Sequence, residues 1–337
     1  MAWQHIRGHD ALVEGFRRAV QRGRLAHAYL FTGPAGVGKR LFALELAKSL
    51  LCEEAKEGSL EACDRCPSCV QVEAGTHPDF FTAVRPPEAL EFPIDLMRQL
   101  CQSFSLKSAR GRGKVVLIDD ADDLNPEAAN CFLKTLEEPP PRSVLILIGS
   151  TPDRQLQTIV SRCQVIRFAP LSPELVDELL QAQGIDDSVL RARLVRLSAG
   201  RPGMAKELAD PALWDFRRDL LDGLTKTPIA TVDLSHKWMD FVEEAGKESA
   251  AQRRRAQLVL RLLIDFLDDA LTIAMNGSPR RTEADERSGL ETLARHAGPD
   301  RLLEALERCL EADRQIDRRV QLVLILEGLM DALGQKL

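Results

Sequence analysis

Two short stretches of the chain contain residues whose types and spacing favour chemistry, and the first is GPAGVGKR at 33–40. The backbone N–H groups of such a glycine-rich loop point inward at phosphate oxygens, and Lys39 supplies a cation for the outer phosphates. The phosphate-binding pattern G-x-x-x-x-G-K-[ST] has a hydroxyl at the next position, where this chain has Arg40. An ordinary strand–helix turn is the alternative. The loop glycines are Gly33, Gly36 and Gly38.

A phosphate loop of an enzyme needs an acidic partner, and the apolar run KVVLIDD (114–120) ends in Asp119 and Asp120. In such enzymes an acidic residue at the end of another strand holds Mg²⁺. Acidic residues also commonly end strands, which is the alternative interpretation.

Two details count against hydrolysis. Arg40 cannot coordinate a cation, and Asp120 stands where such ATPases often place the longer Glu; a misplacement of about 1 Å costs roughly a hundredfold in rate. We therefore expect any bound ATP or ADP not to be hydrolysed and Mg²⁺ not to be required. Arg40 would either hold phosphate without magnesium or pair internally with Asp119.

The second stretch is CEEAKEGSLEACDRCPSC, at 52–69, which contains four cysteines. Two C-x-x-C spacings bring thiolates to one ion from tight turns, and four thiolates complete a tetrahedral zinc shell without an open position. The pattern predicts structural Zn²⁺, and reactive or incidental cysteines are the alternative. His77 is close in sequence, but a fourth cysteine makes it unnecessary as a ligand. The predicted ligands are Cys52, Cys63, Cys66 and Cys69.

Composition limits the function classes that remain. Hydrophobic residues make up 45% and charged residues 28% of the 337, and the net charge is −6. A dedicated DNA-binding protein usually carries a basic excess, so nucleic-acid contact must be local or shared with partners. No apolar stretch approaches the roughly 18 residues that span a bilayer, and the N-terminus lacks a signal-peptide core. We expect a cytoplasmic protein with reduced thiols.

Apolar periodicity predicts alternating strands and helices in the first half of the chain. Asn125 before Pro126 is a good helix start, and EEPPP at 137–141 ends that helix. Such alternation favours an α/β domain with a parallel sheet and flanking helices, and everything after about residue 169 is predicted to be helical. The expected strands are 28–32, 79–84, 114–120, 143–150 and 163–168.

Several runs occur in an order that matches one family. They are HAYLFTGPAGVGKR, the cysteine insert, THPDF, KVVLIDDAD, EAANCFLKTLEEPP and TIVSRCQVIRF. Together they closely resemble the bacterial clamp-loader AAA+ subunits of the DNA polymerase III holoenzyme, and among these the delta-prime type. The match covers residues 3 to about 208, and the last third is similar only in being helical and of suitable length.

The resemblance implies three parts and a set of partners. The parts are an AAA+ α/β domain at 1–168 with a zinc-binding insert at 52–69, a small helical lid at 169–208, and an all-α collar at 209–337 that oligomerises. In the family, five such subunits form a ring that opens the sliding clamp and places it on primed DNA. The implied partners are gamma/tau-type and delta-type subunits, the clamp, and DNA through the complex.

The resemblance also assigns roles to single residues. Ser161, Arg162 and Cys163 match the family's SRC motif, which makes Arg162 the candidate arginine finger acting on a neighbour's ATP. Without the resemblance, a solvated loop arginine would be the default interpretation. Ser150 becomes a candidate sensor of the γ-phosphate. The family's motor subunits carry a lid arginine at the position of Gly203 in this chain.

The departures from the motor pattern favour a scaffold that lends Arg162 to a neighbour and does not itself hydrolyse ATP. The runner-up is an active gamma/tau-type motor ATPase, which the missing loop hydroxyl disfavours. A third class is a direct nucleic-acid binder that uses the basic clusters at 107–114 and 253–255, for which solvated loop and helix faces are the alternative.

Overall fold

The computed structural model describes residues 2–56, 58–86, 89–226, 228–281 and 286–337. It divides into two compact units, one ending at Glu207 and the other beginning at Leu208, which are described separately. None of the helices in these ranges is long and apolar enough to cross a membrane.

The first unit is built on one sheet of five parallel strands in the order β2-β3-β4-β1-β5. Every residue of β1, β3 and β4 is buried, as expected for strands covered on both faces. The predicted α/β fold with a parallel sheet and flanking helices is confirmed. The strands are β1 (Ala28–Thr32), β2 (Phe80–Ala83), β3 (Lys114–Ile118), β4 (Ser143–Ile148) and β5 (Gln164–Arg167).

Strand β1 has the predicted bounds, and the other four strands are one or two residues shorter at one or both ends than the sequence predicts. Strands β3 and β4 end with their apolar runs, before the polar and glycine residues that the prediction included. Asp120 has a left-handed φ of +54°, which strand geometry does not allow, so β3 stops before the two aspartates. Gly149 and Ser150 likewise follow β4 as a connection to the next turn.

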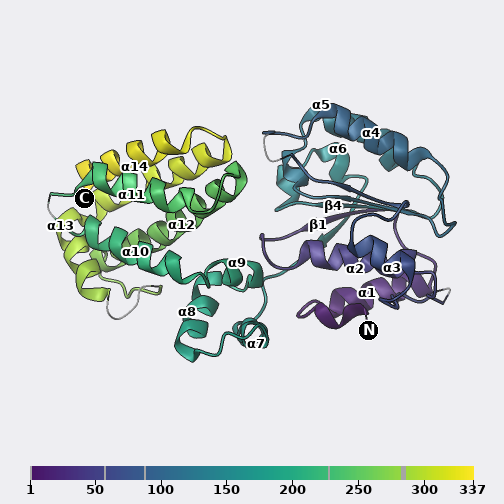
Figure 1. Ribbon diagram of the computed structural model, residues 1–337, viewed down its shortest axis with the longest axis horizontal. Helices are drawn as coiled ribbons and strands as arrows, with labels where there is room; N and C mark the ends of the chain where they lie inside the picture. The colour runs from purple at the N-terminus through teal and green to yellow at the C-terminus, as the bar shows by residue number, and fades with distance from the viewer. Residues whose placement is uncertain (1, 57, 87–88, 227, 282–285) are drawn as a thin grey trace. The chain divides into compact units, whose positions relative to one another are not determined.

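Helices cover both faces of the sheet (Figure 1). Helix α5 has the predicted bounds because Asn125 caps it, its side chain accepting from the amide of Ala128 at 2.8 Å. The helices before β5 are η1 (Ala2–His5), α1 (Asp10–Gln21), α2 (Lys39–Leu51), α3 (Pro67–Glu73), α4 (Ile94–Ser105), η2 (Ala121–Asp123), α5 (Pro126–Glu137), η3 (Pro152–Arg154) and α6 (Gln157–Val160). Those after β5 are α7 (Pro173–Ala182), α8 (Ser188–Ser198) and α9 (Pro202–Glu207).

Each face of the sheet has its own hydrophobic core. Side chains alternate along a strand, so Phe31 of β1 packs with α1 and α2 on one face, whereas Leu30 packs with α4 and α5 on the other. Phe42 of α2 lies at the centre of the first core, with its ring centroid 5.1 Å from Trp3 and 5.3 Å from Phe168. These aromatic contacts fix α2, and with it the glycine loop that precedes this helix.

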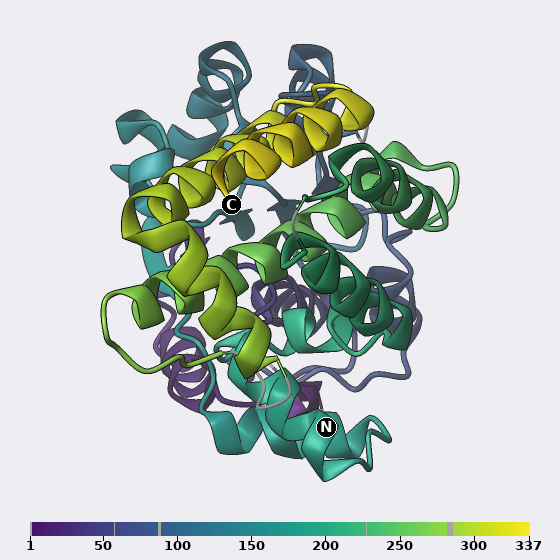
Figure 2. The ribbon, with the colours of Figure 1, turned by 90° about the vertical axis from the view of Figure 1, so that its left-hand side faces the viewer.

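The second unit contains helices and no strand among its described residues (Figure 2). Helix α13 packs against α12 and α14 and is kinked at Gly298, just before Pro299. Buried Asp269 accepts from the amides of Arg280 and Arg281, which ties the segment after α12 to that helix. The helices are α10 (Pro211–Leu224), α11 (Thr231–Glu243), α12 (Ser249–Ala274), α13 (Arg287–Asp317) and α14 (Leu322–Lys336).

The chain is divided once, after Glu207, and the short helices α7 to α9 belong to the first unit. The sequence-based boundary at 168, and the roles of lid and collar for 169–208 and 209–337, stay predictions.

We predict that Phe42→Ala destabilises the first unit by about 3–5 kcal/mol, because it leaves a cavity among aromatic rings that cannot all move inward. Hydrogen exchange at the amides of β1 measures this unit separately from the helical one. The control is Leu41→Ala on the same helix; Leu41 is 42% exposed, and we expect a change within about 0.5 kcal/mol. Similar increases of the β1 exchange rates in Phe42→Ala and Leu41→Ala would contradict the packing argument.

Candidate functional site

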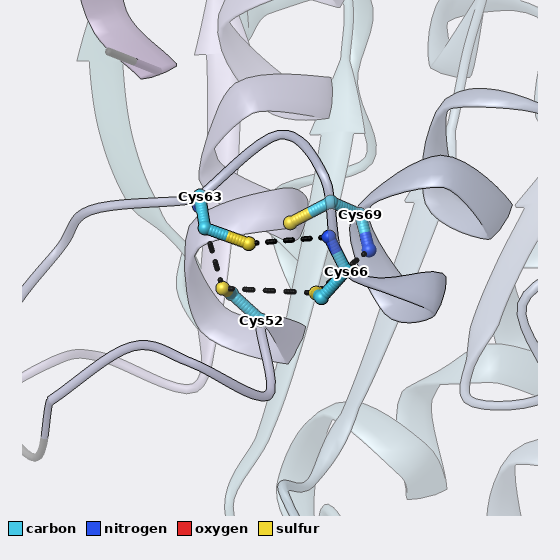
Figure 3. A group of neighbouring side chains, drawn as sticks. All are labelled: Cys52, Cys63, Cys66 and Cys69. Atoms are coloured by element: carbon cyan, nitrogen blue, oxygen red, sulfur yellow. Dashed lines mark hydrogen bonds between the residues drawn. The ribbon is translucent and has the colours of Figure 1, made fainter.

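Four cysteine side chains meet beside the end of α2 and the start of α3 (Figure 3). Their sulfurs all lie within 4.8 Å of one another, and Cys52 Sγ and Cys66 Sγ are 3.9 Å apart. Tetrahedral zinc with Zn–S bonds of about 2.3 Å places its sulfurs about 3.8 Å apart, whereas a disulfide needs about 2.05 Å. The four free thiols therefore fit a zinc shell. The cluster consists of Cys52, Cys63, Cys66 and Cys69.

Backbone N–H groups prepare the cluster for negative charge. The amide of Cys63 donates to Cys52 Sγ at 3.4 Å, and the amide of Cys69 donates to Cys66 Sγ at 3.4 Å. Burial by itself raises the pKa of the Cys66 thiol, but backbone hydrogen bonds outweigh burial and lower this pKa to about 7, whereas burial raises the pKa values of the Cys63 and Cys69 thiols. Because the thiolate is the form that binds metal, and four thiolates leave no open position, the cluster suits a structural ion.

The basic run at 107–114 fastens the cysteine insert to the first unit. Arg110 forms an ion pair with Glu53 and donates to Ser68 Oγ at 3.0 Å. Ser68 Oγ in turn donates to the Glu53 carboxylate at 2.8 Å. Arg112 donates to the backbone oxygen of Glu53 at 2.6 Å. These two arginines thus hold the insert.

His77 belongs to the same polar network and not to the cluster of sulfurs. Its Nδ1 accepts from the amide of Asp79, so its Nε2 carries the proton and donates to Ser68 Oγ; both distances are 3.0 Å. Burial by itself raises the pKa of the Asp79 carboxyl, but hydrogen bonds from Ser108 and the following amides outweigh burial and lower this pKa. Both ring nitrogens of His77 are in use, which fits a supporting role.

The glycine loop joins β1 to α2 at the carboxyl edge of the sheet. Gly38 precedes α2 with a φ of +102°, a conformation that side-chain-bearing residues rarely adopt. Gly33 and Gly36 also have positive φ values, +142° and +83°. The N-terminus of α2 thereby opens toward the loop, an arrangement that attracts phosphate.

Both cations of the loop have partners within the first unit. The buried Lys39 Nζ donates to the backbone oxygens of Gly33 and Pro34, the second at 2.9 Å. Arg40 Nη1 lies 2.7 Å from Asp119 Oδ2. Burial lowers the pKa of Lys39, and the nearby Asp119 opposes this shift. Arg40 therefore neutralises the charge of Asp119, the residue that the sequence predicts to hold Mg²⁺.

A backbone hydrogen bond joins α9 to the glycine loop. The amide of Gly203 donates to the backbone oxygen of Gly36 at 2.9 Å, and a Cβ atom at Gly203 would lie 2.9 Å from Gly36 Cα. That separation is shorter than real Cβ contacts allow, so a larger residue at 203 requires the loop to move. Sequence reasoning missed this contact, although it noted that glycine replaces an arginine at this position.

Ser150 retains a feature expected of a phosphate contact. Its Oγ is buried and has no hydrogen-bond partner in the part of the chain that the structure describes. Its backbone oxygen accepts from the amide of Gly33 at 2.9 Å, and its own amide donates to Asp122 at 2.8 Å. A buried hydroxyl without a partner costs free energy that a phosphate oxygen could offset. Asp120, by contrast, is exposed at the edge of the site.

Arg162 lies after α6, and its guanidinium faces the end of α5. Its Nε and Nη2 both donate to Glu137 Oε1, at 3.0 and 2.6 Å, and its Nη1 donates to the backbone oxygen of Thr158 at 3.0 Å. The side chains of Arg162 and Glu137 are 34% and 51% exposed, so a partner can reach this pair. The sequence did not single out Glu137, whose position in TLEEPP gave no signal beyond the end of a helix.

Two relatives of the chain carry the same subunit name. A Pseudomonas aeruginosa protein named DNA polymerase III subunit delta' is 40% identical over 225 residues, which are 64% of this chain and 67% of that protein. The Escherichia coli protein of the same name is 32% identical over 288 residues, covering 84% of this chain and 80% of that protein. The chain belongs to the DNA polymerase III delta' family.

Other comparisons find further similar proteins. The family model described as "DNA polymerase III, delta subunit" matches residues 8–172. The Escherichia coli protein named subunit tau is 33% identical over 174 residues, covering 52% of this chain but 26% of tau. A solved structure of a gamma subunit-related protein from Thermotoga maritima aligns with a TM-score of 0.49 at 15% identity, covering 96% of this chain and 99% of that one.

We predict that the chain purified without chelator contains about one zinc ion, and that Cys66→Ser loses most of it because three thiolates leave the shell open. Elemental analysis of the folded protein measures the ratio. The matched control is Cys131→Ser, outside the cluster, which should keep its zinc. Wild-type protein with no zinc and four freely titrating thiols would overturn the metal assignment.

We predict that nucleotide binding by the wild-type chain does not require Mg²⁺, because Arg40 stands where a hydroxyl would coordinate the ion. Arg40→Thr should make ATP bind about tenfold tighter with Mg²⁺ than without it, whereas the wild-type ratio stays near one. Titration calorimetry in both conditions measures the ratios. Arg98→Thr, an exposed arginine on α4, is the control and should behave as wild type.

Proposed function

We propose that this chain is the non-hydrolysing, finger-donating subunit of a replicative clamp loader. It holds structural zinc, keeps its own phosphate loop internally paired, and lends Arg162 to the ATP site of a neighbouring subunit. The observation that carries the proposal is the Arg40–Asp119 ion pair, which uses the acidic residue that a motor subunit would give to magnesium.

Three features of the loop support the absence of hydrolysis. Lys39 donates to carbonyl oxygens of its own loop, Arg40 replaces the hydroxyl, and the turn at Gly203 packs on the backbone of Gly36. A nucleotide that enters must break these contacts before it meets the amides of the loop. Ser150 would still meet a phosphate oxygen, so binding of ATP or ADP stays compatible with the site while catalysis does not.

The geometry of Arg162 supports a role outside its own chain. A guanidinium offers five N–H donors in a planar fork that suits carboxylate and phosphate alike. Glu137 accepts two of these donors through one oxygen, in a partly exposed position. A neighbour's phosphate is a stronger acceptor than one carboxylate oxygen, so Arg162 can exchange Glu137 for the phosphoryl group on assembly.

Relatives named as tau, gamma and delta' subunits of DNA polymerase III support the assembly of this chain with other clamp-loader subunits. We propose gamma/tau-type and delta-type neighbours in a five-membered ring, with the sliding clamp and primed DNA reached through the complex. In this scheme 169–208 forms the lid and 209–337 the collar. The internal contacts of Lys39 and Arg40 disfavour an active gamma/tau-type motor. A DNA-binding role of 107–114 is disfavoured because Arg110 and Arg112 hold the insert.

We predict that Arg162→Ala in a reconstituted loader lowers hydrolysis at the ATP site it serves by about 10³–10⁵-fold, because charge on the transferred phosphoryl group loses its stabilising cation. Single-turnover ATPase measurements on the assembled complex, with clamp and primed DNA, resolve that site from the others.

Two controls separate this role from the alternatives. Arg154→Ala changes another exposed arginine of the same region and should leave the rate unchanged. Lys39→Ala should also leave it unchanged, since the chain's own loop does not hydrolyse ATP. ATPase activity of the isolated chain that disappears in Lys39→Ala would instead establish the motor alternative, and an unchanged rate in Arg162→Ala would remove the finger assignment.

A further inference from the structure

A second pocket lies at the opposite end of the sheet from the phosphate loop. It has a volume of about 500 Å³ and is lined by the residues that begin β3 and β4, together with residues just before β1. Parallel strands place their amino ends at one edge and their carboxyl ends at the other, so this pocket is separate from the edge that carries Gly33 and Asp119. Its volume is in the range of small-ligand sites.

An unpaired cation distinguishes this pocket in a chain of net charge −6. Arg112, Lys114 and Arg142 line it, and no Asp or Glu is among the residues that do. Arg112 and Lys114 direct their charged ends to backbone carbonyls of the insert and of α4, which do not line the pocket. Exposed Arg142 forms no ion pair or hydrogen bond within the described part of the chain, so its guanidinium is available.

The backbone at Arg142 is held in a conformation that its residue type rarely adopts. Its φ is +58°, in the left-handed region that favours glycine. A Cβ at the adjacent Gly113 would lie 1.9 Å from the carbonyl oxygen of Arg142, so only glycine permits this approach of the two strand starts. Strained backbone of this kind tends to occur where a side chain must be aimed at a ligand.

Ser143, the next residue, faces the other side of the sheet. Its register partner in β3 is Lys114, and side chains alternate along a strand, so its buried Oγ lies on the face covered by α4 and α5. Val20 and Leu50 pack on the opposite face. Arg142 is therefore the side chain that can contact an anion in the pocket.

Most of the remaining lining is apolar, and the ring of His27, a further polar residue of the lining, contacts the backbone oxygen of Leu136 at 3.0 Å. Val20, Leu25 and Leu50 are partly buried side chains that continue the hydrophobic core into the pocket. The three prolines at 139–141 form part of the wall, and their fixed φ values limit how far it can move. The pocket therefore combines a preformed apolar surface with one free planar cation.

We propose that this pocket binds an amphipathic carboxylate: an apolar group of roughly one aromatic ring with a short chain that ends in a single carboxylate. The apolar group packs against Leu25 and Leu50, and the carboxylate accepts the fork of Arg142. The same chemistry occurs in a free organic acid and in the C-terminal residue of a polypeptide, which the experiment distinguishes.

The test uses the full chain with labelled Leu and Val methyl groups, observed by NMR. The probe is 4-phenylbutyrate, compared with its uncharged amide and with acetate. We expect saturable shifts at Val20, Leu25 and Leu50 with 4-phenylbutyrate, and binding at least about tenfold weaker for the amide and for acetate. No saturable shift at these methyls, or equal affinity for the amide, would overturn the proposal.

Variants locate the anion contact. Arg142→Glu and Arg142→Gly should each weaken 4-phenylbutyrate binding by about tenfold or more; the glycine variant suits the left-handed backbone and guards against misfolding. Arg98→Glu changes the charge equally outside the pocket and should bind as wild type. Ser143→Ala should bind 4-phenylbutyrate as wild type, because its hydroxyl faces the other side of the sheet. Equal weakening in Arg98→Glu and Arg142→Glu would contradict the site.

A further titration distinguishes a free organic acid from the C-terminal residue of a polypeptide. A Gly-Gly-Gly-Phe peptide with a free C-terminus is titrated beside its C-terminal amide and beside 4-phenylbutyrate. Tighter binding of the free-acid peptide than of 4-phenylbutyrate supports the pocket as a receptor for a polypeptide terminus. Tighter binding of 4-phenylbutyrate supports an organic acid. Both results require the Arg142 dependence, without which the proposal fails.

Discussion

The ion pair between Arg40 and Asp119 is the interaction on which the character of the carboxyl edge of the sheet depends. It contributes little to stability, because Arg40 is 59% exposed and solvent screens such pairs. Its importance is chemical, because a carboxylate that is already paired with a guanidinium attracts a divalent cation less strongly. Lys39 is engaged in the same way with the carbonyls of its own loop, so the edge is electrostatically balanced without a ligand.

Polar contacts hold the cysteine insert at 52–69, which has little hydrophobic core of its own, against the rest of the first unit. Trp3 Nε1 donates to the backbone oxygen of Leu60, and buried Lys48 pairs with Asp64 and Glu45 at 2.8 Å. Burial by itself lowers the pKa of Lys48, but these carboxylates outweigh burial and raise it. Together with Arg110 and Glu53, the contacts reach the insert from several sides, so the surrounding unit itself positions the four sulfurs.

Local signals made part of this structure predictable. The C-x-x-C spacings predicted that four sulfurs would meet, and Asn125 with Pro126 fixed the start of α5, because both depend on residues a few positions apart. The contact between Gly36 and Gly203 joins residues far apart in the chain, so no local sequence pattern predicts it. The same holds for the pair of Arg162 and Glu137. The basic run at 107–114 resembled a nucleic-acid surface, since sequence does not show that an arginine already has a carboxylate.

The two ends of the parallel sheet differ in how their charges are arranged. At the carboxyl edge, Arg40 and Asp119 compensate each other, which suits a subunit whose own nucleotide site is passive. At the amino edge, Lys114 and Arg112 donate to backbone carbonyls outside the pocket, and Arg142 has no partner in the described residues. Arg142 is exposed and therefore solvated, so its guanidinium can meet an anion without first breaking an ion pair. At the carboxyl edge an anion would first have to displace the contacts of Lys39 and Arg40.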